Sequence, residues 1–130
     1  MASKFKFSKR SLKNLEGVHP DLVKVVRRAL EISPIAFMVT EGVRTITRQQ
    51  TLLNMGASKT MKSRHLTGHA VDIAALLGKD IRWDWPLYER LATVFKTAAA
   101  DVGVQIEWGG DWKIFRDGPH YQLSWREYPV

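Results

Sequence analysis

Two long segments of the chain repeat apolar residues with the period of an amphipathic helix. In residues 20–33 the apolar side chains recur three and four positions apart, with basic residues on the other side, and Pro34 follows the segment. In residues 84–102 a second apolar stripe runs up to Gly103, a residue type that commonly ends helices. The pattern therefore predicts two helices, each with one buried face.

Four shorter segments alternate apolar and polar residues, which is typical of β-strands. These segments are residues 35–40, 70–74, 104–108 and 120–123. Gly109-Gly110, after the third segment, predicts a tight turn. Together with the two helices, the strands predict an α+β domain in which helices pack on a small, mainly antiparallel sheet.

A shorter helix is predicted between the first two strands. Thr47 and Gln50 have the spacing of a capping box, so this helix should run from there to about Met55 and stop at Gly56. Residues 57–67 are polar and basic, and they predict a loop that leads into the second strand.

The length and composition of the chain are those of one folded domain. Its 130 residues, of which 45% are hydrophobic and 25% charged, can bury one core but hardly two. No internal repeat, low-complexity tract or linker-like stretch indicates a domain boundary. We therefore expect one domain over residues 1–130, with a basic segment at residues 1–19 and the core of the domain at residues 20–130.

A formal net charge of +7 favours anionic partners. Nucleic acid, a membrane surface and an acidic polymer such as a bacterial envelope all fit, and charge alone does not choose among them. The charge can also serve only to keep a small domain soluble. The sequence has no cysteine, which excludes disulfides, thiolate metal ligands and cysteine nucleophiles. Any metal ion must therefore be bound by His, Asp or Glu.

Residues 1–10 carry positive charges but lack the uninterrupted apolar stretch of a signal peptide. No other segment approaches the length of a membrane span. We therefore expect a protein that is made and folded in the cytoplasm, and that needs a separate route to act outside it.

A charged side chain interrupts the apolar strand predicted at residues 70–74. The motif around it is Ser63-x-His65-x-x-Gly68-x-Ala70-x-Asp72. An ionised carboxylate on a buried strand is costly unless a cation or a metal ion lies nearby, so Asp72 requires such a partner. His65, at the end of the preceding loop, can supply it only as a fellow ligand of a metal ion.

A second motif, Asp117-x-Pro119-His120, leads into the last predicted strand. With it the chain has two histidines and one carboxylate, a ligand set of catalytic zinc that leaves the fourth position for water. Asp117 would then be free to take a proton from that water and pass it to a leaving amine.

A second interpretation stays open on spacing alone, because a histidine and an aspartate seven positions apart occur by chance in many basic proteins. In this interpretation His65 is a solvated loop residue and Asp72 pairs with an arginine. His120 is then a hydrogen-bonded histidine of the core.

Together, the two motifs resemble the paired signature of the D-Ala-D-Ala metallopeptidase superfamily. Residues 42–45 (Gly-Val-Arg-Thr) and residues 108–112 (Trp-Gly-Gly-Asp-Trp) flank the first motif in the order seen in phage endolysins that are L-alanyl-D-glutamate peptidases. The resemblance covers about residues 20–125. The acid before the final histidine is Asp, where the dipeptidase relatives use Glu, and this favours the endolysin branch. The resemblance implies a hedgehog/D-Ala-D-Ala peptidase-like fold with a zinc site on its sheet.

The resemblance also implies the roles of the polar residues in these motifs. His65, Asp72 and His120 would bind one zinc ion per chain, and Asp117 would be the general base and acid. Arg44 matches a family arginine that steadies negative charge on the substrate or in the transition state, although it can also be a plain surface arginine.

Residues near the motifs have further expected roles. Ser63 matches a position near the substrate, although a loop-capping serine fits nearly as well. His69 is not expected to be a ligand, and Asp111 is expected to support the site without binding the metal. The aromatic residues of this part of the chain can line a substrate cleft, although such residues are more often core. They are Trp108, Trp112 and Tyr121.

The function that the resemblance implies is that of a zinc-dependent endolysin, which hydrolyses the L-alanyl-D-glutamate bond of peptidoglycan stem peptides and lyses the host cell. Two alternatives remain: a D,D-carboxypeptidase or dipeptidase that acts on D-Ala-D-Ala, and a non-catalytic basic module that binds the envelope or nucleic acid. For the endolysin, residues 20–130 would be the catalytic core.

The endolysin is expected to be a monomer that binds peptidoglycan but not nucleic acid, helped by electrostatic contact with the anionic envelope. We expect no separate wall-binding domain. The enzyme would accumulate in the host cytoplasm and reach the periplasmic cell wall after membrane permeabilisation.

Overall fold

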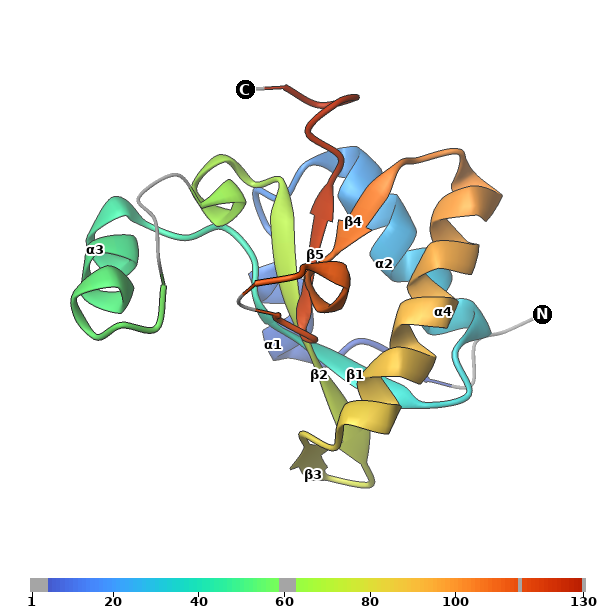
Figure 1. Cartoon of the computed structure of the whole chain (residues 1–130). Helices are drawn as coiled ribbons and strands as arrows, with labels where there is room; N and C mark the ends of the chain where they lie inside the picture. Colours follow the sequence, from blue (N-terminus) through green and yellow to red (C-terminus); the bar gives the residue numbers. More distant parts are fainter. Residues whose placement is uncertain (1–4, 59–62, 115, 130) are drawn as a thin grey trace.

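The computed structural model describes residues 5–58, 63–114 and 116–129, which form an α+β domain around one sheet (Figure 1). The strands have the order β1-β2-β5-β4, and β3 pairs with β2. They are β1 (Ala36–Glu41), β2 (Ala70–Leu77), β3 (Asp80–Arg82), β4 (Ile106–Trp108) and β5 (His120–Leu123). Each of these pairings is antiparallel, which confirms the predicted fold class.

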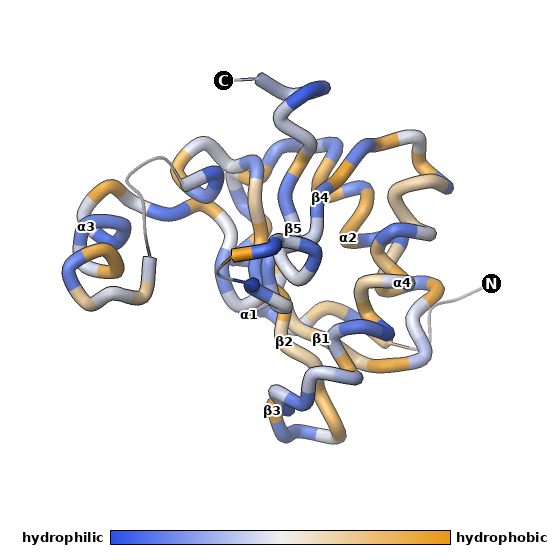
Figure 2. The backbone as a smooth tube through the Cα atoms, viewed as in Figure 1, coloured by the Kyte–Doolittle hydropathy of each residue, from blue (hydrophilic) through white to orange (hydrophobic). Residues whose placement is uncertain are grey.

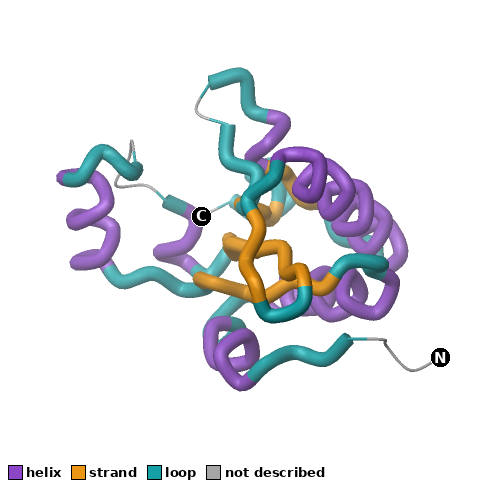
Figure 3. The backbone as a smooth tube through the Cα atoms, turned by 90° about the horizontal axis from the view of Figure 1, so that it is seen from below, coloured by secondary structure: helices purple, strands orange, loops and turns teal. Residues whose placement is uncertain are grey.

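Helices surround this sheet. They are α1 (Lys9–Asn14), α2 (Pro20–Ile32), α3 (Ile46–Asn54) and α4 (Trp85–Val102), with the short 3-10 helices η1 (Arg64–Thr67) and η2 (Gly109–Asp111). α2 and α4 pack side by side, as Figure 3 shows. α3 stands away from the rest of the domain in Figures 1 and 3, and hydrophobic and hydrophilic residues are mixed along it in Figure 2. Across the described residues, the helices are too short or too polar to cross a membrane.

One hydrophobic core lies between the α2–α4 pair and the sheet. Alternation along β2 directs Val71 and Ile73 into this core, and alternation along β5 directs Tyr121 and Leu123 there. Phe95 of α4 stacks on Tyr121, with their ring centroids 4.1 Å apart. Because successive residues of a strand point to opposite faces, the residues between these core positions point to the other face of the sheet.

Helix α1 docks against β1, and the hydrophobic pattern did not predict it. The hydroxyl of Ser11 accepts a hydrogen bond from the N–H of Val39 at 3.0 Å, and Nδ2 of Asn14 donates to the carbonyl of Val39 at 2.9 Å. Ser8 caps the helix by accepting from the N–H of Ser11. Because β1 is at the edge of the sheet, these two side chains pair backbone groups that no further strand can pair.

Helix α3 is confirmed, but its predicted cap is wrong. The capping residue is Thr45, whose hydroxyl accepts from the N–H of Arg48. Thr47 lies inside the first turn, where its carbonyl accepts from the hydroxyl of Thr51. Both threonines can cap a helix, but α3 begins after the earlier one. At Arg44, just before Thr45, the chain leaves the sheet, and the N–H of Arg44 donates to a carbonyl of η1.

Strand β3 was not predicted, and other elements differ from the predictions at their ends or in type. β2 is longer than predicted because β1 and β3 both pair with residues 75–76. β4 starts at Ile106, and Gly109-Gly110 forms part of η2 instead of a tight turn. Of the predicted loop at 57–67, residues 64–67 form η1, and residues 59–62 lie outside the described residues.

The Ser11→Ala variant tests how α1 is anchored. It leaves the buried N–H of Val39 without its partner, so the free energy of unfolding should fall by about 1–3 kcal/mol. Urea denaturation followed by circular dichroism measures the change. The control is Thr93→Ala on an exposed part of α4, which should change this free energy by less than about 0.5 kcal/mol. Equal effects of the two variants would contradict the anchoring role.

Candidate metal centre

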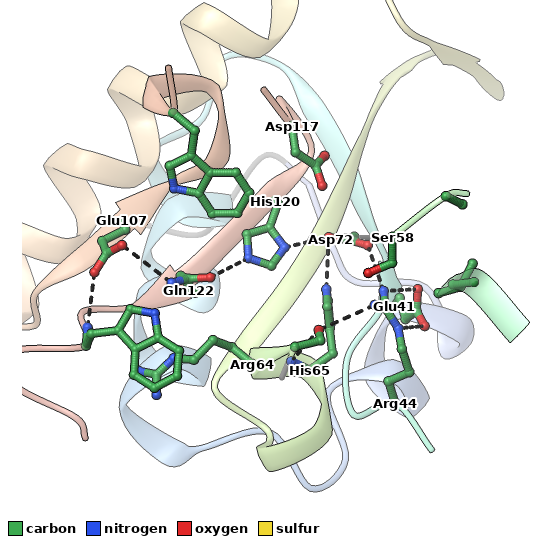
Figure 4. Close-up of a pocket in the computed structure, with 15 residues that line it drawn as sticks. Glu41, Arg44, Ser58, Arg64, His65, Asp72, Glu107, Asp117, His120 and Gln122 are labelled. Atoms are coloured by element: carbon green, nitrogen blue, oxygen red, sulfur yellow. Dashed lines mark hydrogen bonds and ion pairs between the residues drawn. The ribbon is translucent and has the colours of Figure 1, made fainter. Parts of the chain in front are cut away.

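Three side chains from distant parts of the sequence converge beside the sheet (Figure 4). His65 lies on η1, Asp72 on β2 and His120 at the start of β5. Oδ1 of Asp72 is 3.2 Å from Nε2 of His65 and 3.3 Å from Nδ1 of His120. One possible ligand atom from each residue lies within 4.8 Å of the others. The structure therefore brings together the three residues that the sequence predicts as metal ligands.

Strand register and a glycine turn produce this convergence. Asp72 and His120 are direct neighbours across the β2–β5 pair. η1 begins after Ser63, whose hydroxyl accepts from the N–H of His65, and it ends at Gly68 with a φ of 76°. A larger residue at Gly68 would be strained, and its Cβ would collide with a backbone carbonyl, so this turn requires glycine. The turn leads the chain into β2 with His65 facing Asp72.

Hydrogen bonds on the outer side of each imidazole ring decide which nitrogen faces Asp72. Nδ1 of His65 bonds the carbonyl of Gly42 at 2.8 Å, and Nε2 of His120 bonds Oε1 of Gln122 at 2.7 Å. These oxygens only accept, so a neutral ring carries its proton there and directs a lone pair inward. The lone pairs of the two imidazoles and an oxygen of the Asp72 carboxylate then face one another. These electron-rich atoms repel one another unless a metal ion or a proton lies between them.

The spacing and chemistry of these donors fit a zinc ion. Zinc binds imidazole nitrogen and carboxylate oxygen at about 2.0–2.2 Å in a tetrahedron, which places neighbouring ligand atoms roughly 3.3 Å apart. The separations measured from Asp72 are 3.2 and 3.3 Å. Burial opposes ionisation of Asp72, but when a proton lies between the rings and this carboxyl group, hydrogen bonds from His120 and His65 outweigh burial and hold its pKa well below its usual range. The carboxylate therefore stays charged, as a metal ligand must.

Arg44 is a nearly buried and well-bonded side chain, which rules out a plain surface arginine. Its guanidinium donates to the two carboxylate oxygens of Glu41 at 2.7 and 2.9 Å, and to Oε1 of Gln49 at 2.8 Å. Nη1 also lies 3.4 Å from the hydroxyl of Ser63. Nη2 is 3.6 Å from Oδ2 of Asp72, the carboxylate oxygen that does not face the histidines. Arg44 therefore adds positive charge to the second side of Asp72.

Asp117 lies next to His120, at the edge of the cluster (Figure 4). Its N–H donates to the carbonyl of Gly109 at 3.0 Å, and its own carbonyl accepts from the N–H of His120 at 3.2 Å. Burial, reinforced by the negative charge of Asp72, raises the pKa of the Asp117 carboxyl. A carboxyl group with a raised pKa beside such a cluster is suited to accept and return a proton.

These groups share one cavity with a volume of about 570 Å³. Figure 4 shows Glu41 and Arg44 on one side of the three converging residues and Glu107 on the other. Ser63 caps η1 and also lines this cavity.

Two residues behind His120 were not predicted. Gln122 accepts from His120, and its Nε2 donates to Oε1 of Glu107 at 3.4 Å. The other oxygen of Glu107 accepts from the N–H of Trp125 at 3.1 Å. A signal for Gln122 exists in the sequence, because a residue two positions after His120 on a strand shares its face. Glu107 is the direct partner of Gln122 on β4, which only the register shows.

The aromatic residues near the motifs divide between core and cavity. Trp108 and Tyr121 belong to the hydrophobic core. Trp112 lines the cavity, and its ring centroid is 5.1 Å from that of His120. Trp112 is therefore the one of the three expected aromatic residues that can contact a ligand in the cavity.

Two other polar residues near the motifs lie outside the cavity. His69 bonds the hydroxyl of Thr67 through Nδ1. Asp111 forms an exposed ion pair with Lys96, so the structure does not place it behind the metal ligands as expected.

Known protein families provide a further comparison. The family model of phage L-alanyl-D-glutamate peptidases matches residues 3–123. The L-alanyl-D-glutamate peptidase of Escherichia phage T5 is 37% identical over 117 residues, which cover 87% of this chain and 85% of that protein. The protein of the same name from Listeria phage A118 is 36% identical over 122 residues, which cover 92% of this chain but only 42% of that protein.

Solved structures have the same fold. The L-Ala D-Glu endopeptidase ChiX of Serratia marcescens is 47% identical and superimposes with a TM-score of 0.92, over 98% of this chain and 96% of that chain. The vancomycin resistance D,D-dipeptidase VanXYg is 20% identical with a TM-score of 0.55, over 82% of this chain and 50% of that chain. The second likeness concerns the fold alone.

The Glu41→Gln variant tests whether Arg44 depends on its carboxylate partner. The amide keeps the shape of the side chain but removes the charge that neutralises Arg44, whose side chain is only 8% exposed. The free energy of unfolding should therefore fall by on the order of 2 kcal/mol. Thermal denaturation at neutral pH measures it. Arg82→Gln breaks an exposed ion pair with Asp84 and should change this free energy by less than about 0.5 kcal/mol. A loss in Glu41→Gln no larger than in this control would count against the dependence.

Proposed function

The chain belongs to the phage L-alanyl-D-glutamate peptidase family, and we propose that it hydrolyses the bond between L-alanine and D-glutamate in the stem peptides of bacterial peptidoglycan. The observation that carries this proposal is the cluster of His65, Asp72 and His120 with the carboxyl group of Asp117 beside it in one cavity. Amide hydrolysis requires an activated water and a group that carries its proton to the leaving amine, and this arrangement is suited to both.

The proposed metal ligands are His65, Asp72 and His120, with one zinc ion per chain. When bound, zinc would polarise the scissile carbonyl and lower the pKa of a water molecule to about 7. The distances of 3.2 and 3.3 Å from Asp72 to the two imidazole nitrogens support this role. The hydrogen bonds from the rings to Gly42 and Gln122 support this role, because they keep one lone pair of each imidazole directed inward.

Asp117 is the proposed general base and acid. Burial and the charge of Asp72 raise its pKa, so its carboxylate accepts a proton more readily than that of an exposed aspartate. In the proposed reaction this carboxylate takes a proton from the attacking water and delivers it to the amide nitrogen of D-glutamate. The water oxygen forms the new C–O bond in the first of these two steps, and the C–N bond breaks in the second. L-alanine is left with a carboxyl group, whose proton passes to the free amine of D-glutamate.

Arg44 and Ser63 are proposed to act on the substrate. Glu41 and Gln49 hold the guanidinium of Arg44, so the positive charge is in position before the substrate binds. In this proposal the charge stabilises the negative charge that develops on the scissile carbonyl oxygen. Ser63 lines the same cavity and would bond a polar group of the stem peptide.

The proposed setting is the lysis of a bacterial host by a phage. The net charge of +7 supports electrostatic contact with the anionic envelope. In this proposal a monomeric single peptidase domain, with its ligands within residues 20–130, reaches the periplasmic wall from the host cytoplasm once the membrane is permeabilised.

Two variants separate the metal ligands from the proton carrier. His120→Ala should lose zinc, because a site with two protein ligands in place of three binds it weakly. Asp117→Asn should keep zinc and lose at least about 100-fold in kcat, because the amide cannot carry the proton. Metal analysis by mass spectrometry, together with a turbidity assay on outer-membrane-permeabilised Gram-negative cells, measures both effects.

Three outcomes would overturn parts of this proposal. Loss of zinc from Asp117→Asn would contradict the division of roles. Release of D-alanine from defined muropeptides, in place of a new amino terminus on D-glutamate, would indicate a D,D-carboxypeptidase. A wild-type protein that neither binds zinc nor clears cells after zinc is added would favour a non-catalytic basic binding module.

The Gln122→Met variant tests the hydrogen bond behind His120. Methionine has a similar volume but cannot replace the amide oxygen that orients the ring, so the affinity for zinc should fall about 10–100-fold. Competition with a chromogenic chelator measures the affinity. Gln105→Met, at an exposed glutamine, should bind zinc as the unaltered protein does. An unchanged affinity in Gln122→Met would show that the ring needs no such support.

A further inference from the structure

Arg64 is a buried cation whose hydrogen-bonding capacity is only partly used. It lies on η1 between Ser63 and His65, and 3% of its surface is exposed. Its Nη2 donates to the carbonyls of Leu123 at 2.8 Å and Ser124 at 3.4 Å. Its Nε and Nη1 are shielded from solvent and have no hydrogen-bond partner among the described residues. Such unpaired buried donors are rare in folded proteins and call for an explanation.

The charge of Arg64 also lacks a partner. Among the residues that the structure describes, no carboxylate lies within ion-pair distance of its guanidinium. Burial lowers the pKa of Arg64, and the charge of Glu107 offsets this only in part. Arg44, the other arginine that lines the cavity, is neutralised by Glu41. Of the two, Arg64 is therefore the one without a carboxylate partner among the described residues, and a bound anion could supply that partner.

An aromatic ring covers this guanidinium at the cavity wall. The central carbon of the Arg64 guanidinium lies 3.9 Å from the ring centroid of Trp125, and both residues line the cavity that holds the metal cluster. The indole is itself 45% exposed and follows β5, outside the hydrophobic core. The side chain of Trp125 can thus turn aside without disturbing the core, which would uncover the unpaired donors of Arg64.

We propose that Arg64, together with Trp125, binds the free carboxylate of the glutamate residue next to the scissile bond. The inference rests on the proposed function. A glutamate whose nitrogen is in the scissile amide has two carboxyl groups, and the stem continues through one of them. The other stays ionised, a few bonds from the reacting nitrogen. A guanidinium with unpaired donors, stacked on an indole, matches such a carboxylate in charge and hydrogen bonding.

The test uses two muropeptides that differ at one group. One carries the free glutamate carboxylate, and the other carries a carboxamide in its place. The unaltered enzyme should cleave the acid with a kcat/KM about tenfold or more above that of the amide, because a charged hydrogen bond is lost. In Arg64→Gln this ratio should fall to near one, and Arg64→Lys should keep part of it. A purely structural role of Arg64 would lower both rates and leave the ratio unchanged, which would overturn the proposal.

Arg116 offers a matched control. Its guanidinium also stacks on an indole, 4.3 Å from the ring centroid of Trp85, and donates to the carbonyl of Gly110, but it does not line the cavity. Arg116→Gln should therefore keep the full preference for the acid. If Arg116→Gln lost the preference for the acid to the same extent as Arg64→Gln, the proposal would be overturned.

The subsite and the proposed function can fail separately. Equal cleavage of acid and amide by the unaltered enzyme would overturn the subsite and leave the function standing. Cleavage of neither peptide would overturn the function. The binding of the same two peptides, measured by calorimetry, would then test the subsite. Tighter binding of the acid than of the amide, lost in Arg64→Gln, would support the subsite. Equal binding of the two peptides by the unaltered protein would overturn it.

Discussion

The cross-strand pairing of Asp72 with His120 is the constraint on which the candidate site depends. An ionised carboxylate on a sheet face is unfavourable unless positive groups or a metal ion lie nearby. Here Arg44 lies on one side of Asp72, and two imidazoles that could bind a metal ion with it lie on the other. The opposite faces of the same strands carry Val71 and Tyr121 into the hydrophobic core. A slip of one residue would turn Asp72 into that core. The core therefore sets the register, and the register sets the geometry of the site.

The two arginines that line the cavity differ in their partners within the folded protein. Arg44 is neutralised by Glu41 and held by Gln49, so its position is part of the folded structure. Arg64 has two carbonyl acceptors and an indole, but no carboxylate within the described residues. A buried charge of this kind weakens the fold unless a bound anion offsets it. Arg64 would thereby lower the stability of the free protein and raise its affinity for an anionic substrate.

The long elements were predictable because their signal is local. The helical period of α2 and α4 and the alternation of β1 and β5 follow from which residues face the core. Helix α1 has only six residues and is held by bonds to Val39, so no local pattern reveals it. The cap of α3 at Thr45 in place of Thr47 likewise depends on where the chain leaves the sheet, near a hydrogen bond between Arg44 and η1.

The sequence by itself determined the fold class, because periodicity follows from which neighbouring residues face the core. It pointed to the converging residues through the resemblance of its two motifs to a known family, whereas their spacing alone left an interpretation without a metal ion open. Only the tertiary structure decided which nitrogen of each ring faces Asp72 and that Glu41 neutralises Arg44. It also decided that Arg64 lies buried with no carboxylate partner in the part of the chain that the structure describes. Hydrogen bonds are directional and act over short distances. These hydrogen bonds therefore depend on how segments far apart in the chain pack together, and the local sequence does not predict that packing.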